Sequence, residues 1–170
     1  MKKTVQSMVD EAMAVITTYS VDEARALHGR DDVQFIDLRD VRELEREGVI
    51  PGAFHAPRGM LEFWVDPESP YHKPLFAEDK RFVLFCAMGW RSALSTKTLQ
   101  DMGVDPVAHI EGGFTAWKAA GAPVAQRAAK VANPERPDGP ARPALPALAN
   151  QPDPSDRPDK GTAAANEPRS

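Results

Sequence analysis

Apolar and polar positions in residues 17–125 alternate between short apolar runs and segments with helical spacing. Continuous apolar runs of four or five residues are typical of strands that are buried on both faces of a parallel sheet. One such run occupies residues 82–85, and shorter or mixed β-prone runs at 16–19, 33–37 and 106–110 are also predicted as strands. Because the runs alternate with helical segments, the pattern predicts an α/β domain with helices on both faces of its sheet.

Helix start and stop signals lie between these runs. Ser20 and Glu23 have the spacing of a capping box, which predicts a helix that extends to about Leu27. The charged segment 41–47 predicts a short exposed helix that ends at Gly48. Each helix would connect two neighbouring runs, as the crossover connections of a parallel sheet require.

The two ends of the chain differ from this pattern. Apolar residues at helical spacing in 1–16 predict an amphipathic helix that packs on the edge of the domain or makes a homodimer contact. Residues 126–170 contain nine of the chain's 16 prolines and no aromatic residue. That composition predicts a disordered tail, because it offers too little apolar surface to offset the entropy lost on ordering.

The run at 82–85 ends at Cys86, the only cysteine of the chain. Gly89 and Arg91 follow within five residues, and Ser92 is expected to cap the next helix. A loop that enters a helix directs backbone N–H groups into one concavity, which favours an anion there. Cys86 is therefore a candidate thiolate nucleophile. The alternative is a buried structural cysteine, for which the glycine and the arginine would have no evident role.

Composition and charge narrow the classes of function. The net charge of −4, without a basic stripe, argues against a nucleic-acid partner. One cysteine allows neither an internal disulfide nor a cysteine-based metal cluster, and it fits a reducing compartment. Asp10 and Glu11 interrupt the apolar character behind the basic start of the chain, so we expect no secretion signal, no membrane span and a cytoplasmic location.

Three motifs in one order resemble the rhodanese-like domain family. They are Asp37-Leu-Arg39-Asp40-Val-Arg-Glu43 with Gly48-Val-Ile-Pro51-Gly52-Ala53, then Cys86-x-x-Gly89-x-Arg91-Ser92, and last Ile110-Glu111-Gly112-Gly113-Phe114-x-x-Trp117 with Gly121-x-Pro123-Val124. The resemblance covers residues 17–124 and implies a five-stranded parallel sheet, with a short third strand within 50–56.

The resemblance implies a sulfurtransferase that moves a sulfane sulfur through a persulfide on Cys86. The donor would be thiosulfate or a persulfide, the acceptor a thiol or cyanide, and no metal or organic cofactor would be needed. The expected substrate-binding residues are Ala87, Met88, Gly89, Trp90, Arg91, Ser92 and Arg58. We expect Arg91 to brace the loop rather than to turn inward and neutralise the charge of the donor.

Polar residues near the other predicted strands are candidates for orienting this loop. Asp37 and Arg39 follow the run at 33–37 and should share its carboxyl edge with Cys86, although Asp37 could equally cap its own turn. For Glu43 we favour a solvated face over an ion pair with one of the arginines. His55 is expected to be a packed, hydrogen-bonded histidine rather than a base.

The segment 57–76 concentrates aromatic residues, prolines and cations. It either walls the pocket, with Arg58 facing the loop, or forms a packed surface excursion. Its charge matters because Ala87 stands where many rhodanese sequences carry a basic residue that attracts thiosulfate. Unless Arg58 or Lys73 supplies the missing charge, a persulfide donor is the better expectation.

Two other functions stay open at this point. Protein phosphatases and some arsenate reductases use a similar cradle, but with five residues between cysteine and arginine where this chain has the four residues 87–90. The second alternative is a binding or regulatory module without catalysis, although such modules typically lose the cysteine.

Overall fold

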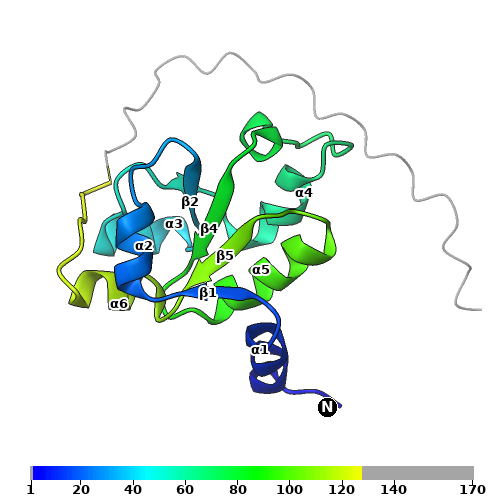
Figure 1. The fold of residues 1–170 in the computed structure, drawn as a ribbon, viewed down its shortest axis with the longest axis horizontal. Coiled ribbons are helices and arrows are strands. Elements are labelled where there is room, and N and C mark those ends of the chain that lie inside the picture. The colour runs from blue at the N-terminus through cyan, green and yellow to red at the C-terminus, as the bar shows by residue number, and fades with distance from the viewer. Residues whose placement is uncertain (1, 128–170) are drawn as a thin grey trace, which may run out of the picture. The chain divides into compact units, whose positions relative to one another are not determined.

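The computed structural model describes residues 2–127, in which helices and strands alternate along the chain (Figure 1). The strands are β1 Thr17–Tyr19, β2 Val33–Asp37, β3 Phe54–His55, β4 Arg81–Phe85 and β5 Val107–Ile110. The α-helices are α1 Val5–Met13, α2 Val21–Leu27, α3 Val41–Glu47, α4 Leu61–Val65, α5 Trp90–Asp101 and α6 Gly113–Ala119. The 3-10 helices are η1 Arg58–Met60 and η2 Pro74–Ala77. From residue 128 onward, the predicted disordered tail lies outside the described residues.

The five strands form one parallel sheet in the order β1-β5-β4-β2-β3. The prediction of a five-stranded parallel sheet is therefore confirmed. β4 is the central strand, and its last residue, Phe85, is level with Asp37 at the end of β2. Leu38 N–H donates to the Phe85 carbonyl at 2.9 Å, so the chain segments that follow β2 and β4 begin side by side at the carboxyl edge.

Two apolar cores cover the faces of the sheet, because neighbouring residues of a strand point to opposite sides. Members of the first core come from β2, β4, α4 and α5, and they include Ile36, Leu84, Leu61 and Leu99. Members of the second come from β2, β4, α2 and α6, and they include Phe35, Val83, Ala24 and Trp117. Figure 1 shows α4 and α5 on one side of the strands and α2, α3 and α6 on the other.

Capping boxes start two of the helices. At α2 the Ser20 hydroxyl accepts from the Glu23 N–H and the Glu23 carboxylate accepts from the Ser20 N–H, as predicted. α3 begins with a second capping box, formed by Asp40 and Glu43, which the prediction did not contain. The Asp40 N–H donates to the Glu43 carboxylate at 2.9 Å, which fixes the direction of this side chain at the start of α3.

The helix after Cys86 begins earlier than predicted. α5 starts at Trp90, and its N-cap is Gly89, which has a left-handed backbone with φ 103°. Ser92 lies in the first turn and is fully buried, so the prediction that Ser92 caps the helix is wrong. The conformational freedom of Gly89 lets the chain pass from strand to helix over the four residues 86–89.

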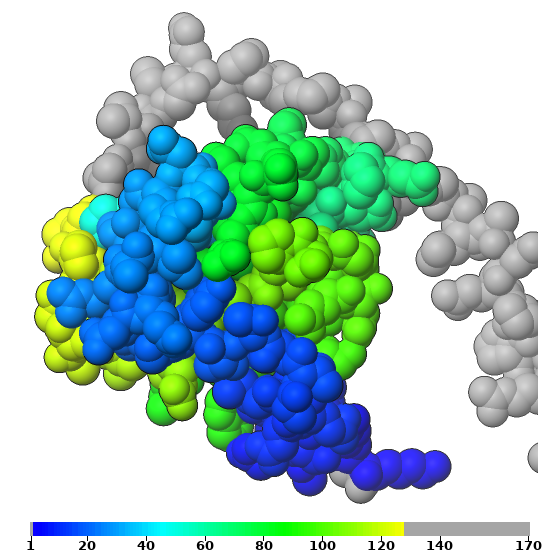
Figure 2. Space-filling view, in the orientation of Figure 1, coloured from blue at the N-terminus to red at the C-terminus, as the bar shows by residue number. Residues whose placement is uncertain are grey.

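α1 packs against α5. Val9 and Ala12 of α1 are buried and form a small apolar cluster with Ala93 of α5, which confirms packing on the edge of the domain. Val5 and Met8 remain exposed, and Figure 2 shows α1 in dark blue as a protrusion of the surface. A homodimer contact through α1 stays a prediction. No helix among the described residues is long and apolar enough to cross a membrane.

The segment between β3 and β4 is a packed excursion. The rings of Trp64 and Phe76 make edge contacts with Phe54, and the Lys73 ammonium lies 5.2 Å from the centroid of the Trp64 ring. Phe76 belongs to the first core. Trp64 and Phe76 therefore pack on the domain on the side of α4, as the second of the two interpretations expects.

Candidate active site

Cys86 directly follows the central strand, at the carboxyl edge of the sheet. Its side chain is 2% exposed, yet it lines a cavity of about 420 Å³ together with Ala87, Met88, Trp90 and Arg91. We call residues 86–91 the Cys86 loop. Four of the predicted substrate-binding residues thus lie around the cysteine in one cavity.

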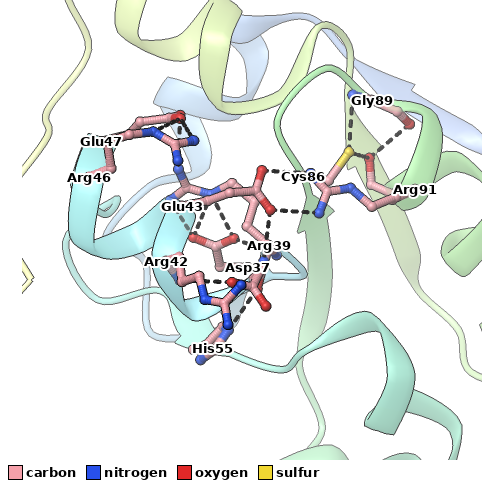
Figure 3. A network of polar contacts seen from close by, with 12 residues as sticks. Asp37, Arg39, Arg42, Glu43, Arg46, Glu47, His55, Cys86, Gly89 and Arg91 are labelled. Carbon is pink, nitrogen blue, oxygen red and sulfur yellow. Dashed lines mark hydrogen bonds and ion pairs between the residues drawn. The ribbon is translucent and has the colours of Figure 1, made fainter.

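Two groups that can donate a hydrogen bond lie next to the Cys86 sulfur (Figure 3). The Gly89 N–H donates to Sγ at 3.2 Å, and the Ser92 hydroxyl lies 3.7 Å from Sγ. The N–H groups of the first turn of α5 have no carbonyl partner within the helix, so its positive end also faces this loop. The sulfur therefore lies where a negative charge is stabilised.

The start of α6 holds the Cys86 loop from behind. The Phe114 N–H donates to the Cys86 carbonyl at 2.8 Å, and the Thr115 N–H donates to the Ala87 carbonyl at 3.0 Å. In a trans peptide the carbonyl and the following N–H point in opposite directions, so the N–H groups of Ala87 and Met88 point away from α6. Two contacts from one helix thus orient two successive peptides of the loop.

This contact requires a glycine at the first residue of α6. Gly113 has φ 57°, and a Cβ there would lie 2.4 Å from the Cys86 carbonyl oxygen and 2.9 Å from the Ala87 carbonyl oxygen. In the sequence, Gly113 was noted only as part of the third motif and was given no role of its own. The structure shows that Gly113 allows α6 to contact the Cys86 loop. Only the tertiary arrangement reveals this role.

Arg91 forms a two-pronged ion pair with Glu43 of α3 (Figure 3). Its Nη1 and Nη2 donate to the two carboxylate oxygens at 2.8 and 2.7 Å. The hydrogen bond from Arg91 is the main reason that the pKa of Glu43 is lowered to about 2, and the same bond raises the pKa of Arg91. The favoured expectation of a solvated Glu43 is wrong, because the capping box aims this carboxylate at the loop.

Asp37 and Arg39 form a second ion pair beneath α3. Arg39 is fully buried and donates through Nε and Nη2 to the Asp37 carboxylate at 2.7 to 3.2 Å, while its backbone N–H also bonds Asp37. The bond from the Arg39 N–H is the capped turn that was expected as one alternative for Asp37, and the carboxylate contacts Arg39 rather than the Cys86 loop. The guanidinium also donates to the Gly48 carbonyl at 2.9 Å and lies 3.7 Å from the centroid of the Phe114 ring. The pair therefore reaches the Cys86 loop indirectly, through α3 and α6.

His55 is held by the same segment. Its Nε2 lies 2.8 Å from the Arg39 carbonyl, which confirms the expectation of a hydrogen-bonded, packed histidine. Arg58, in contrast, is paired with Glu62 at 2.7 Å, and among residues 2–127 it is not one of those that line the Cys86 cavity. In the same part of the chain, no group of three or more His, Cys, Asp or Glu side chains is placed to hold a metal ion.

A buried histidine behind the cysteine was missed by the sequence interpretation. His109 on β5 is 1% exposed, and its Nδ1 lies 3.2 Å from the Ser92 hydroxyl. Burial lowers the pKa of His109 to about 4. The only local signal was a polar residue within an otherwise apolar strand, and that signal does not say which side chain it meets.

The family model described as "Rhodanese-like domain" matches residues 20–120. An uncharacterised protein of Synechocystis is 35% identical over 97 residues, which are 57% of this chain and 49% of that protein. The chain covers less than two thirds of the length of the curated relatives that it matches first.

Two solved structures are also similar. A protein of unknown function from Rhodopseudomonas palustris, described as a possible tyrosine phosphatase, is 57% identical with a TM-score of 0.72, and the match covers 74% of this chain and 96% of that one. The polysulfide-sulfur transferase homodimer from Wolinella succinogenes is 29% identical with a TM-score of 0.56, and the match covers 75% of this chain and 91% of that one.

Proposed function

Because the chain belongs to the rhodanese-like domain family, we propose that it is a sulfurtransferase that carries a sulfane sulfur as a persulfide on Cys86. The observation that carries this proposal is the convergence of the Gly89 N–H and the Ser92 hydroxyl on a sulfur that also lines a cavity. A nucleophilic cysteine needs both features, since donors stabilise its thiolate and the cavity admits the donor molecule.

The first step transfers sulfur to the enzyme. The Cys86 thiolate attacks the outer sulfur of the donor, an S–S bond forms to Sγ, and the donor's own S–S bond breaks. The electron pair of that bond leaves with the remainder of the donor, which departs as a thiolate, or as sulfite when the donor is thiosulfate. The outer sulfur of the new persulfide then lies in the cavity, next to the backbone of residues 87–91.

The second step returns the thiolate. An acceptor thiolate or cyanide attacks the outer sulfur, and the S–S bond to Sγ breaks with its electron pair on Cys86. Arg91 takes no part in bonding the sulfur in this proposal; its ion pair with Glu43 braces the loop in both steps. Asp37 and Arg39 orient the loop through α3 and α6.

The charges around the cavity favour an organic persulfide over thiosulfate. Thiosulfate carries two negative charges, and its binding needs a cation that is not already neutralised. Arg91 is paired with Glu43 and Arg58 with Glu62, while Met88 is 72% and Trp90 51% exposed at the rim of the cavity. The apolar rim suits the organic part of a low-molecular-weight or protein persulfide.

Intact mass after incubation with single donors tests the proposal. Glutathione persulfide is expected to add one sulfur atom to the protein, cyanide to remove it, and Cys86→Ser to abolish the gain. Thiosulfate is expected to load more slowly. Failure of both donors to add sulfur to a folded protein would leave the binding module as the better assignment.

A phenyl phosphate substrate belongs in the same assay, because the similar protein from Rhodopseudomonas palustris is described as a possible phosphatase. The short cradle of four residues and the commitment of Arg91 to Glu43 argue against tight binding of a phosphate. Release of phosphate without sulfur loading would replace the proposal with phosphatase chemistry.

A further inference from the structure

His109 is a buried titratable side chain that the proposed mechanism leaves unused. At neutral pH its ring is neutral, because burial lowers its pKa to about 4. A neutral imidazole has one N–H donor and one nitrogen lone pair. The ring nitrogens have one hydroxyl neighbour each, with the Ser92 Oγ 3.2 Å from Nδ1 and the Thr18 Oγ1 3.1 Å from Nε2.

The position of the ring proton decides what the Ser92 hydroxyl can do. This hydroxyl has a single proton, and besides Nδ1 its acceptors are the Gly89 carbonyl at 3.0 Å and the Cys86 Sγ at 3.7 Å. If Nδ1 has the lone pair, Ser92 donates to it and has no proton left for the sulfur. If Nδ1 has the proton, Ser92 accepts from His109 and its own proton is available to the sulfur.

Thr18 favours the second arrangement. With the proton on Nδ1, the Thr18 hydroxyl donates to the Nε2 lone pair at 3.1 Å. In the opposite tautomer this hydroxyl would accept from Nε2, and its own proton would be left with the Met13 thioether, a weak acceptor 4.0 Å away. The proton on Nδ1 therefore gives Thr18, His109 and Ser92 better hydrogen-bond partners among the described residues.

We propose that His109 is a positioning residue: it donates from Nδ1 to Ser92 and so directs the Ser92 hydroxyl proton to the Cys86 sulfur. When the sulfur becomes negative, the hydroxyl turns from the Gly89 carbonyl to Sγ. The carbonyl is not left unpaired, since it also accepts from the Ala93 N–H at 2.8 Å. The sulfur then has a second donor beside the Gly89 N–H. The inference rests on the proposed function in one respect: sulfur transfer is the reaction in which this thiolate would be used.

The rate of alkylation of Cys86 by iodoacetamide tests the inference without requiring sulfur transfer. Ser92→Ala and His109→Leu are each expected to slow alkylation about tenfold, less than the loss of a donor to an oxyanion because sulfur is a weaker acceptor. The double variant is expected to react no more slowly than the slower single variant. His109→Asn is expected to recover most of the rate, because its side-chain amide keeps an N–H donor near the position of Nδ1.

A loss of packing must be separated from a loss of this hydrogen bond. His28→Leu is the control, because His28 is a second packed, hydrogen-bonded histidine, which contacts aromatic rings and the Pro51 carbonyl on the side of α2, away from the Cys86 sulfur. It is expected to lower the melting temperature without slowing alkylation. Wild-type alkylation in folded His109→Leu, or effects of the two single variants that multiply in the double variant, would overturn the inference.

The tautomer can be measured directly in the wild-type protein, which keeps the test decisive if His109→Leu does not fold. Nitrogen-15 NMR of the His109 ring is expected to show a proton on Nδ1 and none on Nε2. A ring proton on Nε2 and none on Nδ1 would overturn the inference. If alkylation and NMR agree with it but no donor loads sulfur, the proposed function fails and the positioning role of His109 stands.

Discussion

The two sides of the Cys86 loop differ in chemistry. The inner side is polar and lies mostly out of contact with solvent: α6 donates to two loop carbonyls, Ser92 connects to His109, and the partly exposed Arg91 is held by Glu43. The outer side consists of Ala87, Met88 and Trp90, which offer the cavity small or apolar side chains. For the proposed sulfur transfer, we infer from this difference that the inner side fixes the geometry for any donor, whereas the outer side selects among donors.

The largest expected effect concerns the buried ion pair of Asp37 and Arg39, which lies behind the inner side. Arg39→Leu leaves the Asp37 carboxylate buried without its partner, and we expect a loss of about 3–5 kcal/mol in the free energy of unfolding. Urea unfolding measures this loss. The double variant Asp37→Leu/Arg39→Leu should be more stable than the single variant, since no uncompensated charge remains. Equal stability of the two variants would contradict a structural ion pair.

Gly113→Ala is expected to slow sulfur transfer about 100-fold, because a Cβ at this residue pushes the carbonyls of Cys86 and Ala87 out of place. Steady-state rates with glutathione persulfide and thiosulfate should fall together. Gly121→Ala is the matched control: Gly121 also has a positive φ, of 65°, but a Cβ added there would meet no atom within 4 Å. Its backbone strain should lower stability while the rate is kept. If Gly113→Ala slowed transfer from one donor only, the inner side would also affect donor preference, and this result would contradict the proposed difference between the two sides.

On the outer side, Ala87→Arg is expected to raise kcat/KM for thiosulfate about tenfold, equivalent to about 1.4 kcal/mol of attraction by one partly exposed cation. The rate with glutathione persulfide should change much less. Ala87→Gln adds bulk without charge and serves as the control. A similar gain for both donors, or for the glutamine variant, would show that charge at the outer side does not set donor preference.

The smallest effect concerns pH. The folded pKa of Glu43 is about 2 against an ordinary value of 4.5, so its ion pair stabilises the fold above pH 4.5 and this contribution is lost as the pH falls from 4.5 towards 2. Because Arg91 is partly exposed, we expect only about 1 kcal/mol. Unfolding of wild type and Glu43→Gln should differ by this amount at pH 7 and converge near pH 2. A difference that persists at pH 2 would rule out the carboxylate as its source.

Several features of the protein follow from short-range patterns in its sequence. The capping box at Ser20 and the apolar run that ends at Cys86 have local causes, hydrogen bonds and side-chain alternation over a few residues, and the structure has both as predicted. The Asp40 and Glu43 pair had the same local signal, and recognising it would have directed attention to the ion pair with Arg91.

Other features were decided only by the tertiary structure. His109 meets Ser92 because β5 lies beside β4, and Gly113 meets the Cys86 carbonyl because α6 starts at the same edge of the sheet. Arg58 lies away from the cavity because Glu62, one helical turn later, is its partner. Periodicity along the chain sets which face a residue takes, but the order of strands sets its neighbours, and that order depends on how all the apolar faces are buried together.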